Sequence, residues 1–483
     1  MMPSMELTDA SCERARRSRD ARFDGRFFVA VRTTGVFCRP TCPVQPPNAA
    51  NVRFYGTAAA ASAAGYRPCL RCLPELAPGV RASDGSPPLV TQALALIERG
   101  FLDDADSAAL AAAVGVTDRH LRRLFACHIG ATPQRVAHTR RLLFAKHLLD
   151  QSALSVTDIA FAAGFGSVRR FNSLIKSTWG RSPRALRRYR AAADEGIRLR
   201  LDYRPPLDWP ALLDFYRHRA IPEVESVGET TYRRSVRVGD GSGWFAVRPA
   251  PDGHALELEA HLSDMGHLLR LVRGVRRMFD LDADPLAVAA ALGDDPLLGP
   301  VIERQPGLRV PGAWDPFEVA VRAILGQQIS VAAARTLAAR LVAHYGGSLG
   351  DGTAAGPTRT FPAPATLAEA PLETQGVIGT RAAAIRELSA RTACGELDFE
   401  APDLAARLLA IPGIGDWIAQ YVCLRSGLDP DAFPAADLGL LRGAGEGRDM
   451  TPAKLRRRAE AWRPWRAYAA ICLWRRHAES MAR

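Results

Sequence analysis

The chain of 483 residues is longer than a single domain usually is, and its length predicts about three domains. Its 63 lysine and arginine residues outnumber its 51 aspartate and glutamate residues, and the net charge of +12 favours a polyanionic partner. No apolar run approaches the ~18 residues of a membrane span, and the polar, arginine-rich start lacks the apolar segment of a secretory signal. These features exclude a membrane protein and predict a cytoplasmic one, whose nine cysteines do not form a disulfide framework.

Four of the cysteines lie in two close pairs near the N-terminus. Three residues separate the first pair, two separate the second, and 26 residues lie between the pairs. This spacing is typical of a Zn²⁺ site with four thiolate ligands, here Cys38, Cys42, Cys69 and Cys72. On spacing alone, a zinc site that serves only the fold is the more common explanation, and this alternative stays open.

The sequence around these cysteines is more specific than their spacing. FDGRFFVAVRTTGVFCRPTCP, followed by NVRFYGTAAAASAAGYRPCLRC, resembles the N-terminal domain of the Ada adaptive-response proteins over nearly all of residues 20–76. The resemblance implies a small α+β zinc domain at residues 1–76, in which Cys38 takes a methyl group from methylphosphotriesters in DNA. Zinc keeps a thiolate deprotonated at neutral pH, and methylation would remove negative charge and so tighten DNA binding. The expected phosphate contacts of this domain are Arg39, Arg67 and Arg71.

Residues 77–88 are rich in proline, glycine, serine and alanine and are typical of a linker. Two segments with helical spacing and a central glycine turn follow, SAALAAAVGVTDRHLRRLF from Ser107 and SVTDIAFAAGFGSVRRFNSLI from Ser155. They resemble the paired helix-turn-helix domain of the AraC-type regulators over residues 89–190. The resemblance implies a transcriptional activator that binds a promoter or operator site in double-stranded DNA, with RNA polymerase as a further candidate partner. The expected DNA contacts on the second helix of each pair are Arg119, Arg122, Arg123, Arg169 and Arg170.

The pattern changes again near residue 197. Tyr232 to Val238 and Trp244 to Pro249 alternate like strands on either side of a glycine-rich turn at residues 239–243. They predict a hairpin within a small sheet and its helices at residues 197–281. From residue 282 to residue 483 the spacing is mainly helical.

One turn in this helical part predicts contact with DNA. LLAIPGIGDWIAQYVCLRSGLDPDAFPAAD, from Leu408 to Asp437, places the turn IPGIG between two helices, and bare N–H groups at such a turn bind phosphate. With RQPGLRVPGAWDPFEVAVRAILGQQISV and TPAKLRRRAEAWRPWRAYAAICLW, it resembles the helix-hairpin-helix 3-methyladenine DNA glycosylase II (AlkA) family over residues 197–479. The resemblance implies an α+β platform at residues 197–281 and an all-α catalytic body at residues 282–483. The whole chain is therefore expected to be multidomain and mainly α.

The resemblance to the glycosylases gives Asp437 the catalytic role. Its carboxylate would stabilise the sugar as it becomes oxocarbenium-like and would orient the attacking water. Superfamily members that also cut the DNA backbone carry a lysine where this chain has Trp417. The resemblance thus implies a monofunctional enzyme that hydrolyses the N-glycosidic bond of alkylated purines such as 3-methyladenine.

Aromatic residues at the family's pocket positions are expected to hold the damaged base, because ring faces attract a cationic base. They are Trp417, Tyr421, Trp474 and Phe215. Any one of them alone is more often part of a core. Gln328, in the loop ILGQQIS, takes the position of the residue that fills the gap left by the flipped nucleotide. Phosphate contacts are expected at the amides of Gly413, Ile414 and Gly415.

The sequence therefore predicts a DNA-repair glycosylase fused to a zinc-dependent damage sensor and transcriptional activator, associated with the nucleoid through DNA. The alternative is an adaptive-response transcription factor whose glycosylase segment only binds DNA.

Overall fold

The computed structural model describes residues 7–79, 87–187, 196–251, 253–349, 356–401, 403–427, 429–445 and 450–482. Most of the predicted linker, residues 80–86, lies outside the described residues, as do residues 188–195, where the predicted helix-turn-helix domain ends. The chain divides into two compact units. Unit 1 comprises residues 1–205, 250–274 and 281–283, and unit 2 comprises residues 206–249, 275–280 and 284–483. None of the described helices is long and apolar enough to cross a membrane.

Unit 1 begins with a four-stranded sheet in the order β3-β1-β2-β4. Its elements are α1 (Asp9–Ser18), β1 (Phe28–Val31), β2 (Val36–Cys38), β3 (Val52–Tyr55), α2 (Ala58–Ala63) and β4 (Arg67–Pro68). Successive side chains of a strand point to opposite faces, so Val29 packs in the cluster that contains Ala15 of α1, whereas Phe28 packs with Ala61 of α2. The β2 strand pairs antiparallel with β1 and parallel with β4. The predicted small α+β domain is confirmed.

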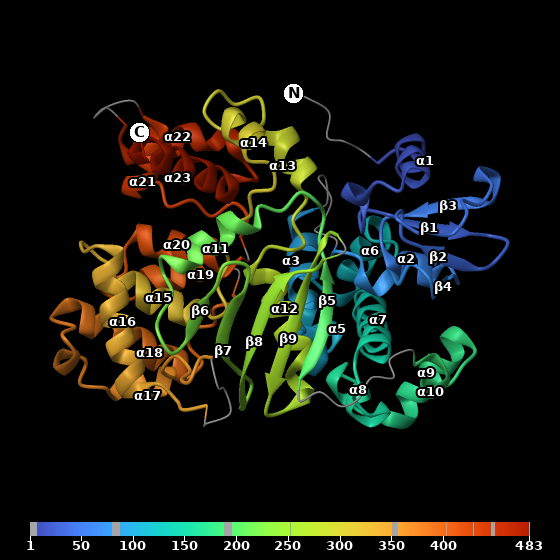
Figure 1. Ribbon diagram of the computed structural model, residues 1–483, viewed down its shortest axis with the longest axis horizontal. Coiled ribbons are helices and arrows are strands. Elements are labelled where there is room, and N and C mark those ends of the chain that lie inside the picture. Colours follow the sequence, from blue (N-terminus) through green and yellow to red (C-terminus); the bar gives the residue numbers. More distant parts are fainter. Residues whose placement is uncertain are drawn as a thin grey trace. The chain divides into compact units, whose positions relative to one another are not determined.

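Helices make up the next described part of unit 1, residues 87–187 (Figure 1). They are α3 (Pro88–Arg99), α4 (Phe101–Asp104), α5 (Ser107–Ala113), α6 (Asp118–His128), α7 (Pro133–Gln151), α8 (Val156–Ala162), α9 (Val168–Trp179) and α10 (Pro183–Leu186). The turns before α6 and α9 contain Gly115 and Gly164 at φ values of 74° and 78°, which only glycine adopts without strain. Thr117 and Ser167 then cap α6 and α9 through their side-chain oxygens. The two predicted helix-turn-helix motifs are therefore present.

Unit 1 also contains β5 (Ile197–Asp202), which pairs antiparallel with β9 (Ala255–Leu262). In unit 2, β6 (Glu225–Val227), β7 (Tyr232–Val238) and β8 (Gly241–Pro249) form an antiparallel meander. The hairpin between β7 and β8 is tighter than predicted. Its turn comprises residues 239–240, with Gly239 at φ 59°, so that β8 begins before the predicted Trp244.

The rest of unit 2 is helical, as predicted. Its helices are α11 (Trp209–Arg217), α13 (Pro285–Leu292), α14 (Gly299–Arg304), α15 (Pro316–Leu325), α16 (Val331–Tyr345), α17 (Pro364–Glu369), α18 (Thr380–Ala393), α19 (Leu404–Leu409), α20 (Asp416–Ser426), α21 (Leu438–Ala444), α22 (Pro452–Ala459) and α23 (Arg466–Ala482). A further helix, α12 (Leu268–Met278), contributes residues to both units. Buried α15 packs against α16, α18 and α20 (Figure 1).

Candidate active site and metal centre

The four predicted zinc ligands meet at one point in unit 1. The parallel pairing of Phe37 with Pro68 brings the ends of β2 and β4 together, so that Cys38 and Cys69, each one residue further on, become neighbours. The sulfur atoms of these two residues and of Cys42 and Cys72 all lie within 4.8 Å of one another, and none forms a disulfide. Zn–S bonds of about 2.3 Å in a tetrahedron place sulfur atoms about 3.8 Å apart, so the group fits one zinc ion.

Backbone donors complete the cysteine cluster. The N–H of Arg39 donates to Sγ of Cys72 over 3.3 Å, and the N–H of Arg71 donates to Sγ of Cys69 over 3.3 Å. Such hydrogen bonds stabilise negative charge on thiolates. Cys72 is buried, whereas Cys38, Cys42 and Cys69 are partly exposed.

The prediction that Arg39 contacts phosphate is wrong. Its side chain is buried, and its Nε donates to both carboxylate oxygens of Asp24 over 3.0 and 2.9 Å, while Nη2 donates to Asp202 over 2.7 Å. A guanidinium held by two carboxylates in the interior has no free face for DNA. Arg67 and Arg71 are exposed and stay candidates.

In unit 2, the side chain of Asp437 is held between two helices. Trp417 of α20 donates its indole N–H to Oδ2 over 2.9 Å, and Trp474 of α23 donates to Oδ1 over 2.8 Å. Asp437 also caps α21, because its Oδ1 accepts the N–H of Leu440 over 3.0 Å. Three N–H donors thus hold the carboxylate in one orientation.

Three of the four predicted pocket aromatics, Trp417, Tyr421 and Trp474, lie at this carboxylate. Trp417 and Tyr421 are one helical turn apart and stack, with centroids 5.4 Å apart and planes 13° from parallel. Tyr421 meets Trp474 edge to face at 6.3 Å. Phe215 of α11 lies apart from this group and, with Trp474, lines a cavity of about 170 Å³, whose lining does not include Asp437.

Phe215 differs from the prediction in one respect, because its ring already binds cations of this chain. The guanidinium carbon of Arg219 lies 3.9 Å from the ring centroid and that of Arg425 lies 4.7 Å from it. The guanidinium carbon of Arg425 also lies 5.6 Å from the ring centroid of Tyr421. Attraction of a cationic base is therefore left to Trp417 and Trp474.

Sequence reasoning missed these arginines, although Arg425 stands out as the one charged residue of α20 after Asp416 at its start. Its Nε and Nη2 donate to the carbonyls of Pro311 and Gly312 over 2.6 and 3.1 Å, and its Nη1 donates to Oη of Tyr421 over 2.8 Å. Burial alone would raise the pKa of Tyr421, but the charges of Arg425 and Arg219 and this hydrogen bond lower it. One side of the pocket is therefore electropositive.

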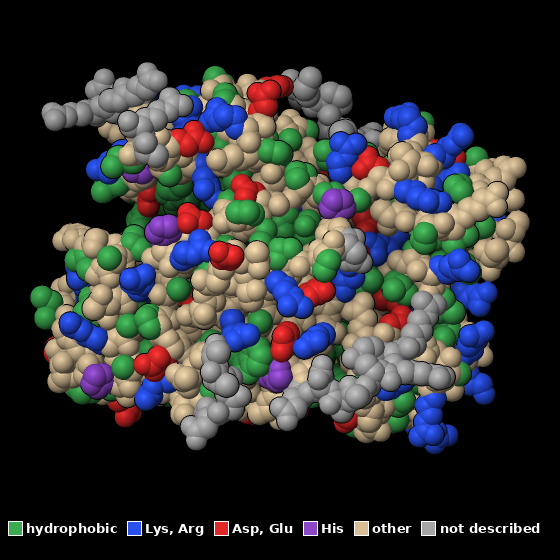
Figure 2. All heavy atoms as spheres, viewed as in Figure 1, with side chains coloured by type: hydrophobic (Ala, Val, Ile, Leu, Met, Phe, Trp, Pro, Cys, Tyr) green, Lys and Arg blue, Asp and Glu red, His purple; other side chains and the backbone are tan. Residues whose placement is uncertain are grey.

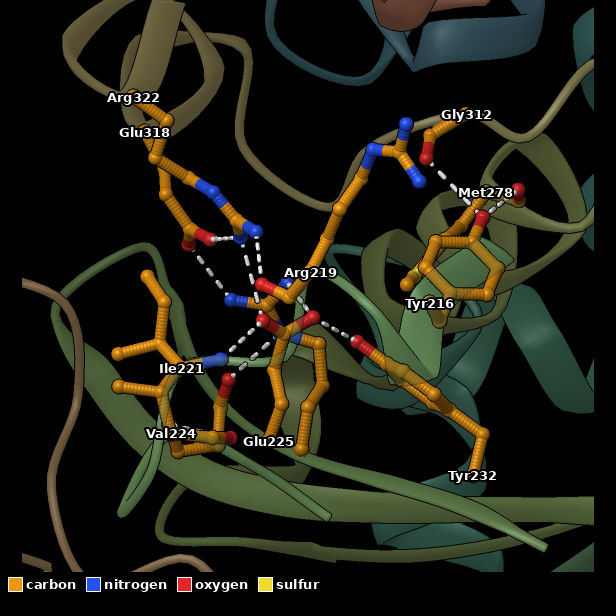
Figure 3. Close-up of polar contacts among 12 residues, drawn as sticks. Tyr216, Arg219, Ile221, Val224, Glu225, Tyr232, Met278, Gly312, Glu318 and Arg322 are labelled. Atoms are coloured by element: carbon orange, nitrogen blue, oxygen red, sulfur yellow. Dashed lines mark hydrogen bonds and ion pairs between the residues drawn. The ribbon is translucent and has the colours of Figure 1, made fainter. Parts of the chain in front are cut away.

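A second buried group of charges fixes the segment that follows α11 (Figure 3). Glu225 accepts hydrogen bonds from Oη of Tyr232 over 2.5 Å and from Arg322 over 3.1 Å. Burial alone would raise the pKa of Glu225, but Arg322, Arg234 and Tyr232 hold it below its ordinary value, so this carboxylate is ionised in the interior.

The predicted phosphate-binding turn and the predicted wedge loop are joined. Gln327 donates its side-chain amide to the carbonyl of Gly413 over 3.0 Å. Gln328 is exposed at φ 56°, a left-handed conformation that is uncommon outside glycine. The turn itself has Gly413 at φ 90°, whereas Gly415 lies in extended backbone.

The N–H of Ile414 is not free for a phosphate contact, contrary to the prediction. It donates to the carbonyl of Ile411 over 3.1 Å and so closes the turn. Gly413 and Gly415 remain candidates. The carboxylate of Asp416 pairs with Arg456 over 2.8 Å, and both side chains are exposed, so screening by solvent keeps this pair weak.

Comparison with known proteins now decides the family. Residues 11–75 match the metal binding domain of Ada, residues 110–189 a helix-turn-helix domain, residues 198–315 the AlkA N-terminal domain, and residues 321–467 the HhH-GPD superfamily of base excision DNA repair proteins. The chain is 42% identical to a probable bifunctional transcriptional activator/DNA repair enzyme AlkA of Mycobacterium tuberculosis, with 96% of this chain and 95% of that protein covered. The chain belongs to this bifunctional AlkA family.

Two further similarities concern the glycosylase part of this AlkA-family chain. It is 37% identical to DNA-3-methyladenine glycosylase 2 of Escherichia coli, over 57% of this chain and 95% of that protein. The structure of a 3-methyladenine DNA glycosylase from Archaeoglobus fulgidus matches 58% of this chain and 98% of its own, with a TM-score of 0.52 and 22% identity, which shows a shared fold. The multidomain, mainly α architecture predicted from the sequence is confirmed.

Membership of the AlkA family also confirms the predicted cofactor and the DNA partner. The Ada-type match covers all four cysteines, so Zn²⁺ is the metal of the site. The helix-turn-helix match covers α6 and α9, which carry the five predicted DNA-contacting arginines. Those five side chains are all exposed, although Arg122 pairs with Asp118 on its own helix. Figure 2 shows Lys and Arg side chains gathered at the right-hand edge, over α9 and α10.

Proposed function

We propose that unit 2 excises alkylated purines such as 3-methyladenine from double-stranded DNA. The observation that carries this proposal is the pair of indole N–H groups that aim at Asp437 from α20 and α23. The damaged base is cationic before cleavage and leaves neutral, so no general acid is needed. The carboxylate instead faces the positive charge that develops on the sugar and orients the water that replaces the base.

The reaction stops at base release. Cleavage of the backbone would need an amine that forms a Schiff base with the sugar, and Trp417 stands at the position expected for it. An indole is not such a nucleophile, and its N–H is already bonded to Asp437. We therefore propose a monofunctional glycosylase.

We further propose that Cys38 accepts a methyl group from a methylphosphotriester. The Cys38 sulfur forms a bond to the methyl carbon while the bond from that carbon to the phosphate oxygen breaks, leaving a phosphodiester anion and a thioether. Zinc supplies the chemistry of keeping the four thiols deprotonated near pH 7. Conversion of one thiolate to a thioether removes one negative charge beside DNA and tightens its binding.

Tighter DNA binding after methylation makes unit 1 a damage-dependent activator. Exposed Arg119, Arg169 and Arg170 would contact operator DNA, and RNA polymerase is the proposed further partner. Such a protein works in the cytoplasm, associated with the nucleoid. The predicted domain boundaries at residues 1–76, 89–190, 197–281 and 282–483 are kept as part of this proposal.

One incubation of the full chain tests both activities. Duplex DNA treated with a methylating agent supplies both 3-methyladenine and methylphosphotriesters. Chromatography should detect free 3-methyladenine with intact strands, and mass spectrometry should find one added methyl group on the peptide containing Cys38. Methylated Cys38 without base release would leave a transcription factor whose glycosylase segment only binds DNA. Base release with unmodified Cys38 would make the zinc site structural.

A further inference from the structure

Four charged residues of unit 2 form a cluster that the reaction steps above do not use. They are Glu225 of β6, Arg234 of β7, and Glu318 and Arg322 of α15. The side chains of the first three are at most 4% exposed, and that of Arg322 is 23% exposed. Two positive and two negative charges balance, which is how charges are tolerated in an interior.

Arg322 connects this cluster to the backbone carbonyl of Arg219 in the segment after α11 (Figure 3). Its Nη1 donates to Glu225 over 3.1 Å and to Glu318 over 2.9 Å, and its Nη2 donates to the carbonyl of Arg219. Glu225 also accepts the N–H of Ile221 over 3.1 Å. The segment after α11 is thus tied at two backbone points to a cluster centred on α15.

This segment continues a wall of the base pocket. The guanidinium of Arg219 lies over the ring of Phe215, four residues earlier, and its Nη1 donates to the carbonyl of Phe215 over 3.2 Å. Tyr216, next to Phe215, donates its hydroxyl to the carbonyls of Met278 and Gly312 over 2.7 and 3.0 Å (Figure 3). The Arg219 side chain therefore supports the Phe215 ring, and both residues line the same cavity.

The C-terminal end of α15, where Arg322 lies, leads to the loop that contains Gln328. The helix ends at Leu325, and Gln328 follows three residues later in its left-handed conformation. Arg322 lies one turn before that end. One helix therefore carries both the side chain that holds the pocket wall and the loop that enters the gap in the duplex.

We propose that Arg322 is a positioning residue of the glycosylase. Arg322 holds the Arg219 carbonyl against α15, and Arg219 in turn supports the Phe215 ring. In this way Arg322 fixes the position of Phe215 relative to the Gln328 loop, so that an extruded base binds beside Asp437. This inference rests on the proposed excision of alkylated purines by unit 2.

The substitution Arg322→Lys tests this role without removing charge. A lysine places its donors on one nitrogen and cannot hold both carboxylates and the Arg219 carbonyl as the guanidinium fork does. Arg234→Lys is the matched control. Arg234 pairs with Glu318 over 2.7 Å and with Glu225 over 3.8 Å in the same cluster, but among the described residues it makes no contact with the Arg219 backbone.

Three measurements on the full-length variants distinguish positioning from stability. Single-turnover release of 3-methyladenine from methylated duplex, with enzyme in excess, should fall about 10- to 100-fold in Arg322→Lys, since a displacement of about 1 Å costs that much. Affinity for unmodified duplex should stay within about twofold of wild type, because phosphate contacts are unchanged. Hydrogen exchange of residues 218–225 should accelerate in Arg322→Lys, and Arg234→Lys should change neither this exchange nor release.

The inference is overturned if both lysine variants lose release equally, or if Arg322→Lys exchanges like wild type at residues 218–225. It is also overturned if the loss of release merely follows a loss of thermal stability that Arg234→Lys shares. If the wild-type protein releases no base, the proposed function is wrong. Hydrogen exchange alone would then test whether Arg322 holds the segment that contains Arg219.

Discussion

Asp437 has both carboxylate oxygens engaged before any DNA arrives. Oδ2 receives the indole of Trp417, and Oδ1 receives the indole of Trp474 and the N–H of Leu440. An aspartate so held cannot rotate freely, and its charge is set in place without reorganisation when the sugar becomes positive. Two stiff aromatic side chains from different helices therefore fix the carboxylate and wall the pocket at once.

Removal of one of these donors should slow excision without weakening DNA binding. Trp417→Phe keeps an aromatic ring beside Tyr421 but deletes the indole N–H. We expect the single-turnover rate to fall about 10-fold, the value of one good hydrogen bond in a transition state. The rate with excess enzyme and the affinity for unmodified duplex provide the two measurements.

Trp462→Phe is the control for this substitution. Trp462 donates its indole N–H to Asp295 over 2.8 Å, so the variant loses the same kind of bond elsewhere in unit 2. It should lower stability and leave the excision rate of the folded enzyme unchanged. Equal slowing by both variants would contradict a special role for the Trp417 bond.

At the scale of elements, the turn between α19 and α20 depends on one glycine more than on the other. Gly413 has φ 90°, and a Cβ there would lie 3.0 Å from Cβ of Ala384. Gly415 is extended, and a Cβ there would meet nothing within 4 Å. Only Gly413 is therefore required by the shape of the turn.

Gly413→Ala should destabilise unit 2 by about 1–2 kcal/mol, because an L-residue is strained in the left-handed region. It should also weaken binding to duplex DNA several-fold, since the turn presents its N–H groups to phosphate. Denaturant unfolding and fluorescence anisotropy measure the two effects. Gly415→Ala should unfold like wild type, and an equal loss of stability in that variant would contradict the assignment.

The sequence allowed the turn between α19 and α20, the Gln328 loop and Asp437 to be predicted, because each lies in a continuous motif. It did not predict that both indoles bind Asp437, because Trp417 and Trp474 reach it from positions 20 and 37 residues away. The phosphate contact of Arg39 was predicted wrongly for the same reason. Its partner Asp202 lies 163 residues away, and no local sequence pattern indicates that the two side chains pair.

At the scale of the whole molecule, unit 1 contains a buried group of charges with one carboxylate in excess. Lys146 of α7 pairs with Asp150 and lies 3.6 Å from Glu75, and all three side chains are at most 5% exposed. Burial raises the pKa of Glu75 from 4.5 to about 7, and Lys146 only partly offsets this. Between about pH 4.5 and pH 7, the Glu75 carboxyl therefore keeps its proton in the folded protein, whereas it is ionised in the unfolded chain.

This protonation gives unit 1 a pH dependence of a definite sign. Because the folded pKa is the higher one, stability from Glu75 is fully present below about pH 4.5 and is lost as pH rises towards 7. Glu75→Gln should remove this dependence and make the protein more stable than wild type at pH 8, by roughly 1–3 kcal/mol. Calorimetry of both proteins at pH 5 and pH 8 tests it, and a variant less stable than wild type at pH 8 would contradict it.

The most direct test of the proposed excision compares base release by wild type, Asp437→Asn and Asp429→Asn. Asp429 is the control, because its carboxylate accepts the N–H of Asp431 over 2.8 Å in the loop after α20 and, among the described residues, makes no hydrogen bond with Asp437. Each protein is incubated in excess over methylated duplex DNA, and free 3-methyladenine is measured over time. The account predicts release by wild type and by Asp429→Asn, and a loss of about 10²- to 10³-fold in Asp437→Asn with unchanged DNA affinity. Equal release by wild type and Asp437→Asn would contradict it.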